Sequence, residues 1–133
     1  MTPKGWKKPV SMTGHTSDLL RCRGFIVTQV EHWKPAMRWD KSLQKNVLVP
    51  FGVRVDAFGF GDLLAAKPGW GVALVQCCAD TDHARRRTKI LTECEWESTE
   101  WKASGGRILL ISWAKKRTEA NMREHWEPRE EEI

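Results

Sequence analysis

Apolar residues fall into short runs along the chain, and the spacing of these runs predicts a mixture of helices and strands. A short helix is expected over residues 18–23, because Thr16 or Ser17 can accept hydrogen bonds from its first backbone N–H groups. Residues 25–33 are sufficiently β-branched and aromatic to predict a strand. The almost entirely apolar residues 107–113 predict a second, buried strand.

Two further apolar runs lie within residues 54–78 and are separated by the Lys-Pro-Gly-Trp sequence of residues 67–70. Pro-Gly is a strong turn signal, because proline presets φ and glycine accepts positive φ. We therefore expect a β-hairpin. If residues 68–70 form its loop, Asp62 on the first arm faces Gln76 on the second. A two-residue loop would turn these two side chains to opposite faces.

The three-residue loop also sorts the small residues of the hairpin onto one face, where a helix can pack closely. This agreement favours that register. It pairs Lys67 with Gly71 and places Phe60 opposite Cys78. The small residues on the shared face are Ala57, Gly59, Gly61, Ala65, Gly71, Ala73 and Val75.

The segment after the hairpin predicts a helix followed by a return strand. The Asp-Thr-Asp sequence of residues 80–82 is a good N-terminal cap for a helix that runs to about residue 96. Residues 93–102 are either the end of this helix or a second short helix, and two glycines then separate them from the strand of residues 107–113. A strand, a helix and a strand in this order predict a parallel, right-handed crossover.

Composition and charge agree with one small domain that has a polyanionic partner. We expect an α/β domain over residues 17–115, a flexible basic arm over residues 1–16, and a charged tail over residues 116–133 that is partly helical or disordered. The 133 residues, 41% of them hydrophobic, can bury one modest core. The net charge is +5, and residues 1–113 hold 17 Lys and Arg against 11 Asp and Glu, so the excess positive charge belongs to the folded part.

Cysteine spacing argues against a zinc-binding protein, and hydropathy argues against a membrane-spanning or secreted one. The cysteines lack the Cys-x-x-Cys pairs typical of zinc sites, and we interpret them as reduced thiols in a reducing compartment. No stretch has the pattern of a membrane span or a secretory signal. We therefore expect a cytoplasmic protein without a membrane partner. The cysteines are Cys22, Cys77, Cys78 and Cys94.

The hairpin and the helix after it carry a family pattern. Asp62 stands in the sequence Asp-Ala-Phe-Gly-Phe-Gly-Asp-Leu-Leu-Ala, Gln76 follows Val75 on the next strand, and a helix with several Arg and Lys comes next. This pattern resembles the PD-(D/E)XK, or restriction-endonuclease-like, nuclease superfamily, and more narrowly its small phage and prophage members. The resemblance covers roughly residues 17–115.

The resemblance implies an α/β fold with an αβββαβ core, in which helices flank a mixed central sheet. It also implies a nuclease or resolvase-like enzyme that hydrolyses DNA phosphodiester bonds, with Mg²⁺ or Mn²⁺ as cofactor. Its partner would be nucleic acid, in the first place DNA, and a homodimer would suit an enzyme that cuts two strands. A phage-encoded member would act in the host cytoplasm.

The same resemblance assigns the metal ligands. Asp62 would supply a carboxylate, Gln76 its amide oxygen and Cys77 its carbonyl, which are ligands that Mg²⁺ prefers. Glu31 on the flanking strand would add a second carboxylate or position a water. Ordinary structural roles remain open for each residue: an aspartate beside glycines often belongs to a turn, a buried glutamine often satisfies backbone groups, and Glu31 can be a solvated strand residue.

The position at which the superfamily carries a lysine is Cys78 in this chain. A thiol holds no fixed positive charge near a scissile phosphate. Some superfamily members are similar in having moved the lysine to a neighbouring element, and Lys89, followed by Arg85, is the candidate here. The alternative is a catalytically inactive nucleic-acid-binding or phage structural protein that retains the nuclease fold.

Two basic segments are candidates for contacts with nucleic acid. The helix after the hairpin offers Arg85 and Arg86, and the polar connection between the first strand and the hairpin offers Lys41 and Lys45 beside Trp39. Cations pair with phosphates while an indole stacks on a base. Alternatively, the helix displays a solvated basic face and Trp39 covers an edge of the core.

Overall fold

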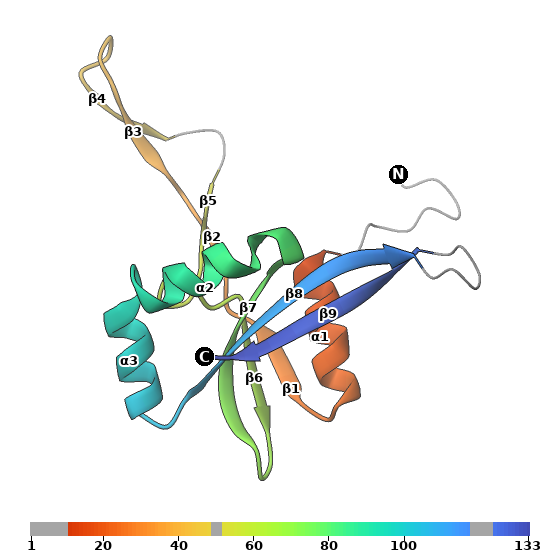
Figure 1. The fold of residues 1–133 in the computed structure, drawn as a ribbon. Coiled ribbons are helices and arrows are strands. Elements are labelled where there is room, and N and C mark those ends of the chain that lie inside the picture. Colours follow the sequence, from red (N-terminus) through yellow and green to blue (C-terminus); the bar gives the residue numbers. More distant parts are fainter. Residues whose placement is uncertain (1–10, 49–51, 118–123) are drawn as a thin grey trace.

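The computed structural model describes residues 11–48, 52–117 and 124–133. Within these ranges the chain has the expected α/β fold, with three α-helices, a mixed five-stranded sheet and a projecting pair of two-stranded sheets (Figure 1). Most of the expected basic N-terminal arm lies outside the described residues.

The central sheet has the strand order β1-β6-β7-β8-β9. Its neighbouring strands pair antiparallel except β7 and β8, which are parallel, as the strand-helix-strand pattern predicted. The parallel pair is buried along most of its length, which agrees with the apolar runs that form it. The strands are β1 (Ile26–Gln29), β6 (Leu63–Lys67), β7 (Gly71–Ala79), β8 (Arg107–Arg117) and β9 (Glu124–Glu132).

The hairpin of β6 and β7 has the predicted three-residue loop, since Lys67 pairs with Gly71. Its first arm is shorter than expected, however, because residues 57–61 form a tight turn before the strand begins. Phe58 and Gly59 both have positive φ in this turn, which glycine adopts without strain. The turn removes Phe60 from the ladder in which we expected it to face Cys78.

One helix packs on each face of this hairpin. α1 (Met12–Cys22) covers the face with the small residues, where Leu20 contacts Ala65, Ala73 and Val75 in one core cluster. The prediction that this face accepts a helix is confirmed for Ala65, Ala73 and Val75. It is wrong for Ala57, which packs against the other core cluster. The helix begins earlier than expected: Ser11 is its N-cap and accepts from the Gly14 N–H at 3.0 Å.

The opposite face of the sheet is covered by α2 (His83–Leu91) and α3 (Glu95–Ala103) (Figure 1). The sequence left open whether residues 93–102 end the first helix or form a second one; a turn at residues 92–94 makes them a second helix. Ile90 and Cys94 are both buried in the second core cluster, together with Leu74 and Ile108 of the sheet. The division lets both helices turn an apolar side to the sheet.

A long β-ribbon projects from the body between β1 and β6 (Figure 1). It consists of two antiparallel pairs: β2 (His32–Lys34) with β5 (Val53–Val55), and β3 (Met37–Asp40) with β4 (Lys45–Leu48). The strand expected over residues 25–33 is therefore divided between the sheet and the ribbon. Glu31 lies at the point of division.

The C-terminal segment differs most from expectation. Instead of a helical or disordered tail, residues 124–132 form strand β9, paired with β8 from Leu109–Glu132 to Arg117–Glu124. Its glutamates face cations: Glu130 pairs with Arg23, and Glu132 with Arg107. None of the helices in the described ranges has the length and hydrophobicity needed to cross a membrane.

Candidate metal centre

Asp62 occupies the junction of three chain segments. It directly precedes β6, and its N–H donates to the Val75 carbonyl of β7 at 2.9 Å. Its own carbonyl accepts from the N–H groups of Val30 and Glu31 at 3.0 and 3.4 Å. The backbone therefore fixes Asp62 against both neighbouring strands, and the direction of its side chain is well determined.

The side chains of Asp62 and Gln76 meet, as the hairpin register predicted. Gln76 Nε2 donates to Asp62 Oδ2 at 2.7 Å, and the Cys77 N–H donates to the same oxygen at 2.8 Å. Both side chains are almost fully enclosed, with exposed fractions of 5% for Asp62 and 2% for Gln76. The contact lies in the interior, where polar groups are costly unless they are paired.

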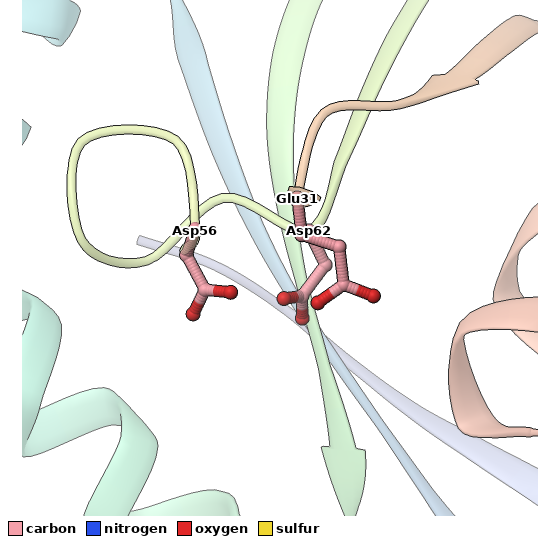
Figure 2. Close-up of side chains that lie close together, drawn as sticks. All are labelled: Glu31, Asp56 and Asp62. Atoms are coloured by element: carbon pink, nitrogen blue, oxygen red, sulfur yellow. The ribbon is translucent and has the colours of Figure 1, made fainter. Parts of the chain in front are cut away.

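Three carboxylates converge at this point: Glu31, Asp56 and Asp62 each place one oxygen within 4.8 Å of the others. They come from the segment between β1 and β2, the end of β5 and the start of β6, and they extend in a common direction (Figure 2). Glu31 and Asp62 are buried and Asp56 is half-buried. The expectation that Glu31 joins Asp62 is consistent with this geometry.

Asp56 is the member of this cluster that sequence reasoning missed as a ligand. It was placed on a continuous hairpin arm, in which no reason existed for it to approach Asp62. The Ala57–Gly61 bridge closes the intervening turn and brings the two aspartates to its two ends. The available signal was the Phe-Gly-Phe-Gly sequence between them, since two closely spaced glycines often mark a turn or bulge.

The electrostatics of the cluster favour a bound cation. Burial, the largest cause, and the charges of Asp56 and Glu31 together raise the pKa of Asp62 to about 8, although the hydrogen bond from the Cys77 N–H lowers it. Without a cation, Asp62 is therefore largely protonated at neutral pH. A divalent ion would allow all three carboxylates to be ionised together.

A second observation also fits a metal ion. The Oε1 atom of Gln76 is buried and has no hydrogen-bond partner among the described residues, although the amide lies directly against Asp62. Buried polar atoms are normally satisfied. Because Nε2 faces Asp62, the amide would have to turn over to bring Oε1 to the carboxylates as a ligand. Carboxylate and amide oxygens are hard donors, and the site suits Mg²⁺ or Mn²⁺ better than a metal that prefers sulfur.

The nearby cysteine is neutral, and the positive charge that acts on it comes from Arg86. Cys78 is buried, which raises the pKa of its thiol to about 11, and Arg86 opposes this shift. Arg86 is half-buried, and its Nε has no hydrogen-bond partner among the described residues. The thiol is therefore protonated at neutral pH and supplies no charge to the site.

Arg85 and Lys89, the two cations predicted to replace the missing lysine, have different surroundings. Arg85 has a side chain that is 69% exposed and pairs with Asp82 at 3.1 Å. The charge of Lys89 acts on Cys94. Burial raises the pKa of the Cys94 thiol, and Lys89 lowers it. Arg85, Lys89 and Arg86 line a common surface hollow of about 520 Å³ on α2. Among them, Arg86 is the one that acts on Cys78.

The remaining predicted contact residues lie on the ribbon. Lys41 and Lys45 are exposed near its tip, and Trp39 on β3 is 58% exposed. Trp39 therefore does not cover the core, which was the alternative interpretation of this residue.

Comparison of the chain with protein-family models, curated proteins and solved structures finds no match. The class of protein follows from the structure itself: it is a mixed α/β protein with a buried cluster of three acidic residues that could hold a metal ion.

Proposed function

We propose that this protein is a metal-dependent nuclease that hydrolyses phosphodiester bonds of DNA. The observation that carries the proposal is the convergence of Glu31, Asp56 and Asp62 next to Gln76, whose buried amide oxygen has no hydrogen-bond partner among the described residues. An acidic cluster alone is a weak indication of function. The buried, unpaired oxygen is an independent sign that a ligand belongs there.

The order of elements supports the same superfamily that the sequence resembles. Reading α1, β1, β6, β7, α2 and β8 in turn gives one helix, three strands, one helix and one strand, which is the αβββαβ order. These strands are consecutive neighbours in the sheet, and the last pair is parallel. The β2–β5 ribbon is then an insertion after the first core strand, and α3 and β9 are additions.

The donor set suggests how the residues divide the work. Asp62, Asp56 and Gln76 Oε1 would hold the ion, with the Cys77 carbonyl at its edge. When bound, Mg²⁺ would lower the pKa of a water molecule and neutralise charge on the phosphate. The Glu31 carboxylate, the remaining member of the cluster, would accept a proton from the attacking water.

Arg86 would supply the positive charge that the superfamily places on a lysine. A guanidinium remains charged at all relevant pH values and can bind two phosphate oxygens at once. Two observations support this role: Arg86 is half-buried beside Cys78, and its buried Nε has no hydrogen-bond partner among the residues that the structure describes. Lys89 and Arg85 would contribute to the basic surface around it, where they would contact the DNA backbone.

A cleavage assay tests the proposal. Labelled single-stranded, duplex and branched DNA would be incubated with the protein and Mg²⁺ or Mn²⁺, with Asp62→Asn and Glu31→Gln as test variants. We expect cleavage by the wild type and losses of about 100-fold or more in both variants. Asp18→Asn, which alters an exposed carboxylate on α1, is the matched control and should remain active.

A second candidate function rests on Cys78, the neutral residue at the lysine position. A protein that retained the fold but lost the catalytic cation would bind nucleic acid without cutting it. If the wild type leaves every substrate intact with either metal while still shifting DNA on a gel, this noncatalytic function replaces the nuclease.

A further inference from the structure

The projecting ribbon is rooted in the carboxylate cluster. β2 begins one residue after Glu31, and β5 ends one residue before Asp56. The two legs of the ribbon therefore start at two of the three acidic residues, and the ribbon extends outward from the site (Figure 1). A polymer that follows the ribbon toward the body arrives at the candidate metal centre.

The ribbon has a strong excess of positive charge. Residues 32–55 contain five Lys and Arg and a single acidic residue, Asp40. Asp40 forms the turn at the tip, where its Oδ1 accepts from the N–H groups of Ser42 and Leu43 at 2.9 and 3.1 Å. The basic residues are Lys34, Arg38, Lys41, Lys45 and Arg54. This charge is complementary to a phosphate backbone.

The outer half of the ribbon also presents an apolar face to solvent. In the β3–β4 register Met37 pairs with Leu48 and Trp39 with Asn46, so these side chains share one face. The exposed fractions of Met37, Trp39 and Leu48 are 54%, 58% and 67%. Arg38 and Lys45 point to the other face. An exposed apolar face, on a ribbon whose other face carries cations, is an unusual surface unless a ligand covers it.

We propose that the ribbon binds single-stranded nucleic acid, whose bases stack on Trp39 and its apolar neighbours. Its phosphates pair with Lys41 near the tip and, around the edges of this two-stranded ribbon, with Arg38 and Lys45 of the other face. A duplex hides the faces of its bases, whereas an unpaired strand can offer them to an indole. From residue 32 to residue 40 the ribbon spans on the order of 30 Å, enough for several nucleotides. The delivery of this strand to the carboxylates rests on the proposed nuclease function.

Binding can be measured apart from cleavage. Fluorescence anisotropy of a labelled oligothymidine of about 20 nucleotides, in EDTA, would compare the wild type with Trp39→Ala and Trp39→Phe. We expect Trp39→Ala to weaken binding about tenfold and Trp39→Phe to retain most of it. Trp96→Ala is the matched control, because Trp96 is also highly exposed, at 72%, but lies on α3.

A charge variant and a duplex complete the test. The triple change of Arg38, Lys41 and Lys45 to Ala should weaken binding and flatten its salt dependence, whereas Lys102→Ala on α3 should do neither. A duplex of the same length should bind more weakly and should not respond to Trp39→Ala. The proposal is overturned if Trp39→Ala and Trp96→Ala bind equally well. It is also overturned if Trp39→Ala changes only a monomer–dimer equilibrium, which would make the ribbon a contact between copies.

The two proposals can fail separately. A wild type that binds the oligonucleotide through Trp39 but cuts nothing would contradict the proposed nuclease function and support the proposed binding by the ribbon. If the wild type cuts single-stranded DNA, and Trp39→Ala cuts it equally well and binds it equally tightly, the proposed binding by the ribbon is contradicted and the nuclease function is supported.

Discussion

Asp62 is the residue whose ionisation most affects the metal-free protein. Burial raises its pKa to about 8, from 3.8 in an unfolded chain, so the folded state binds the proton more tightly than the unfolded state does. The stability that follows from this difference is complete below the unfolded pKa and is lost as the pH rises through the folded pKa. The isolated carboxylate is therefore a source of instability at neutral and alkaline pH.

This argument predicts that the metal-free protein unfolds at lower temperature as the pH rises from about 5 to about 9. The Asp62→Asn variant, which cannot ionise there, should show a weaker dependence and should be more stable than the wild type at the alkaline end. Addition of Mn²⁺ at high pH should raise the Tm of the wild type but not of the variant, because the ion binds the folded state. Calorimetry in EDTA and in Mn²⁺ measures both effects. Identical pH profiles for the two proteins would contradict the assigned cause.

Arg86 and Arg85 are adjacent in sequence, but their side chains have different surroundings. If Arg86 supplies the charge that Cys78 lacks, Arg86→Ala should lower kcat about 10- to 1,000-fold, while Arg86→Lys should recover part of the loss. Arg85→Ala, which removes an exposed side chain paired with Asp82, should alter kcat little. Steady-state cleavage kinetics would separate the two. Equal losses for Arg85→Ala and Arg86→Ala would show that the helix acts only as a basic surface.

At the scale of elements, a buried hydrogen-bonded chain joins α2 to the last two strands. His83 at the start of α2 contacts Ser112 Oγ of β8 at 2.6 Å through Nδ1, and Glu131 Oε1 of β9 at 2.9 Å through Nε2. A serine, a histidine and a carboxylate in this order also occur in hydrolases. Here Ser112 is completely buried, so no substrate can reach its hydroxyl. The series of hydrogen bonds from Ser112 through His83 to Glu131 therefore has a structural role.

His83→Ala should therefore destabilise the protein by about 2–4 kcal/mol, because it leaves two buried or half-buried partners unsatisfied and opens a cavity. Arg87→Ala is a suitable comparison, since Arg87 contacts the same Glu131 at 2.7 Å from an exposed position. Its loss should cost only about 0–1 kcal/mol. Urea unfolding of both variants gives the difference directly. A His83→Ala protein as stable as Arg87→Ala would mean that the interior tolerates the loss.

At the scale of the whole molecule, the hairpin was the part that the sequence predicted best. The Pro-Gly turn determined the loop length, the loop length determined the register, and the register brought Asp62 and Gln76 together. Each of these steps depends on residues that are close in sequence. Local turn chemistry was therefore sufficient to predict half of the candidate site.

The features that were missed depend on contacts between distant residues. Strand β9 looked like a solvated acidic tail because its partners, among them Arg23, His83 and Arg107, lie far away in sequence. Asp56 joined the cluster only through a turn that interrupts an apolar run. Strands β3 and β4 of the ribbon lie between Pro35 and Pro50 in the sequence, where the apolar pattern is weak, and the ribbon strands pair with each other rather than with the central sheet.

This separation of ribbon and core leads to a prediction about the whole chain. The two buried clusters that stabilise the sheet contain none of the ribbon residues that the structure describes. Trp33 and Arg54 pair directly across β2 and β5, so residues 34–53 can be replaced by an Asn-Gly turn that suits a two-residue hairpin.

We expect the shortened protein to fold with a Tm within a few degrees of the wild type and to keep its metal affinity, because Glu31 and Asp56 remain at the two ends of the hairpin. It should lose its affinity for single-stranded DNA. Calorimetry, Mn²⁺ titration and anisotropy on the same sample test the three parts, and loss of folding would show instead that the ribbon belongs to the core.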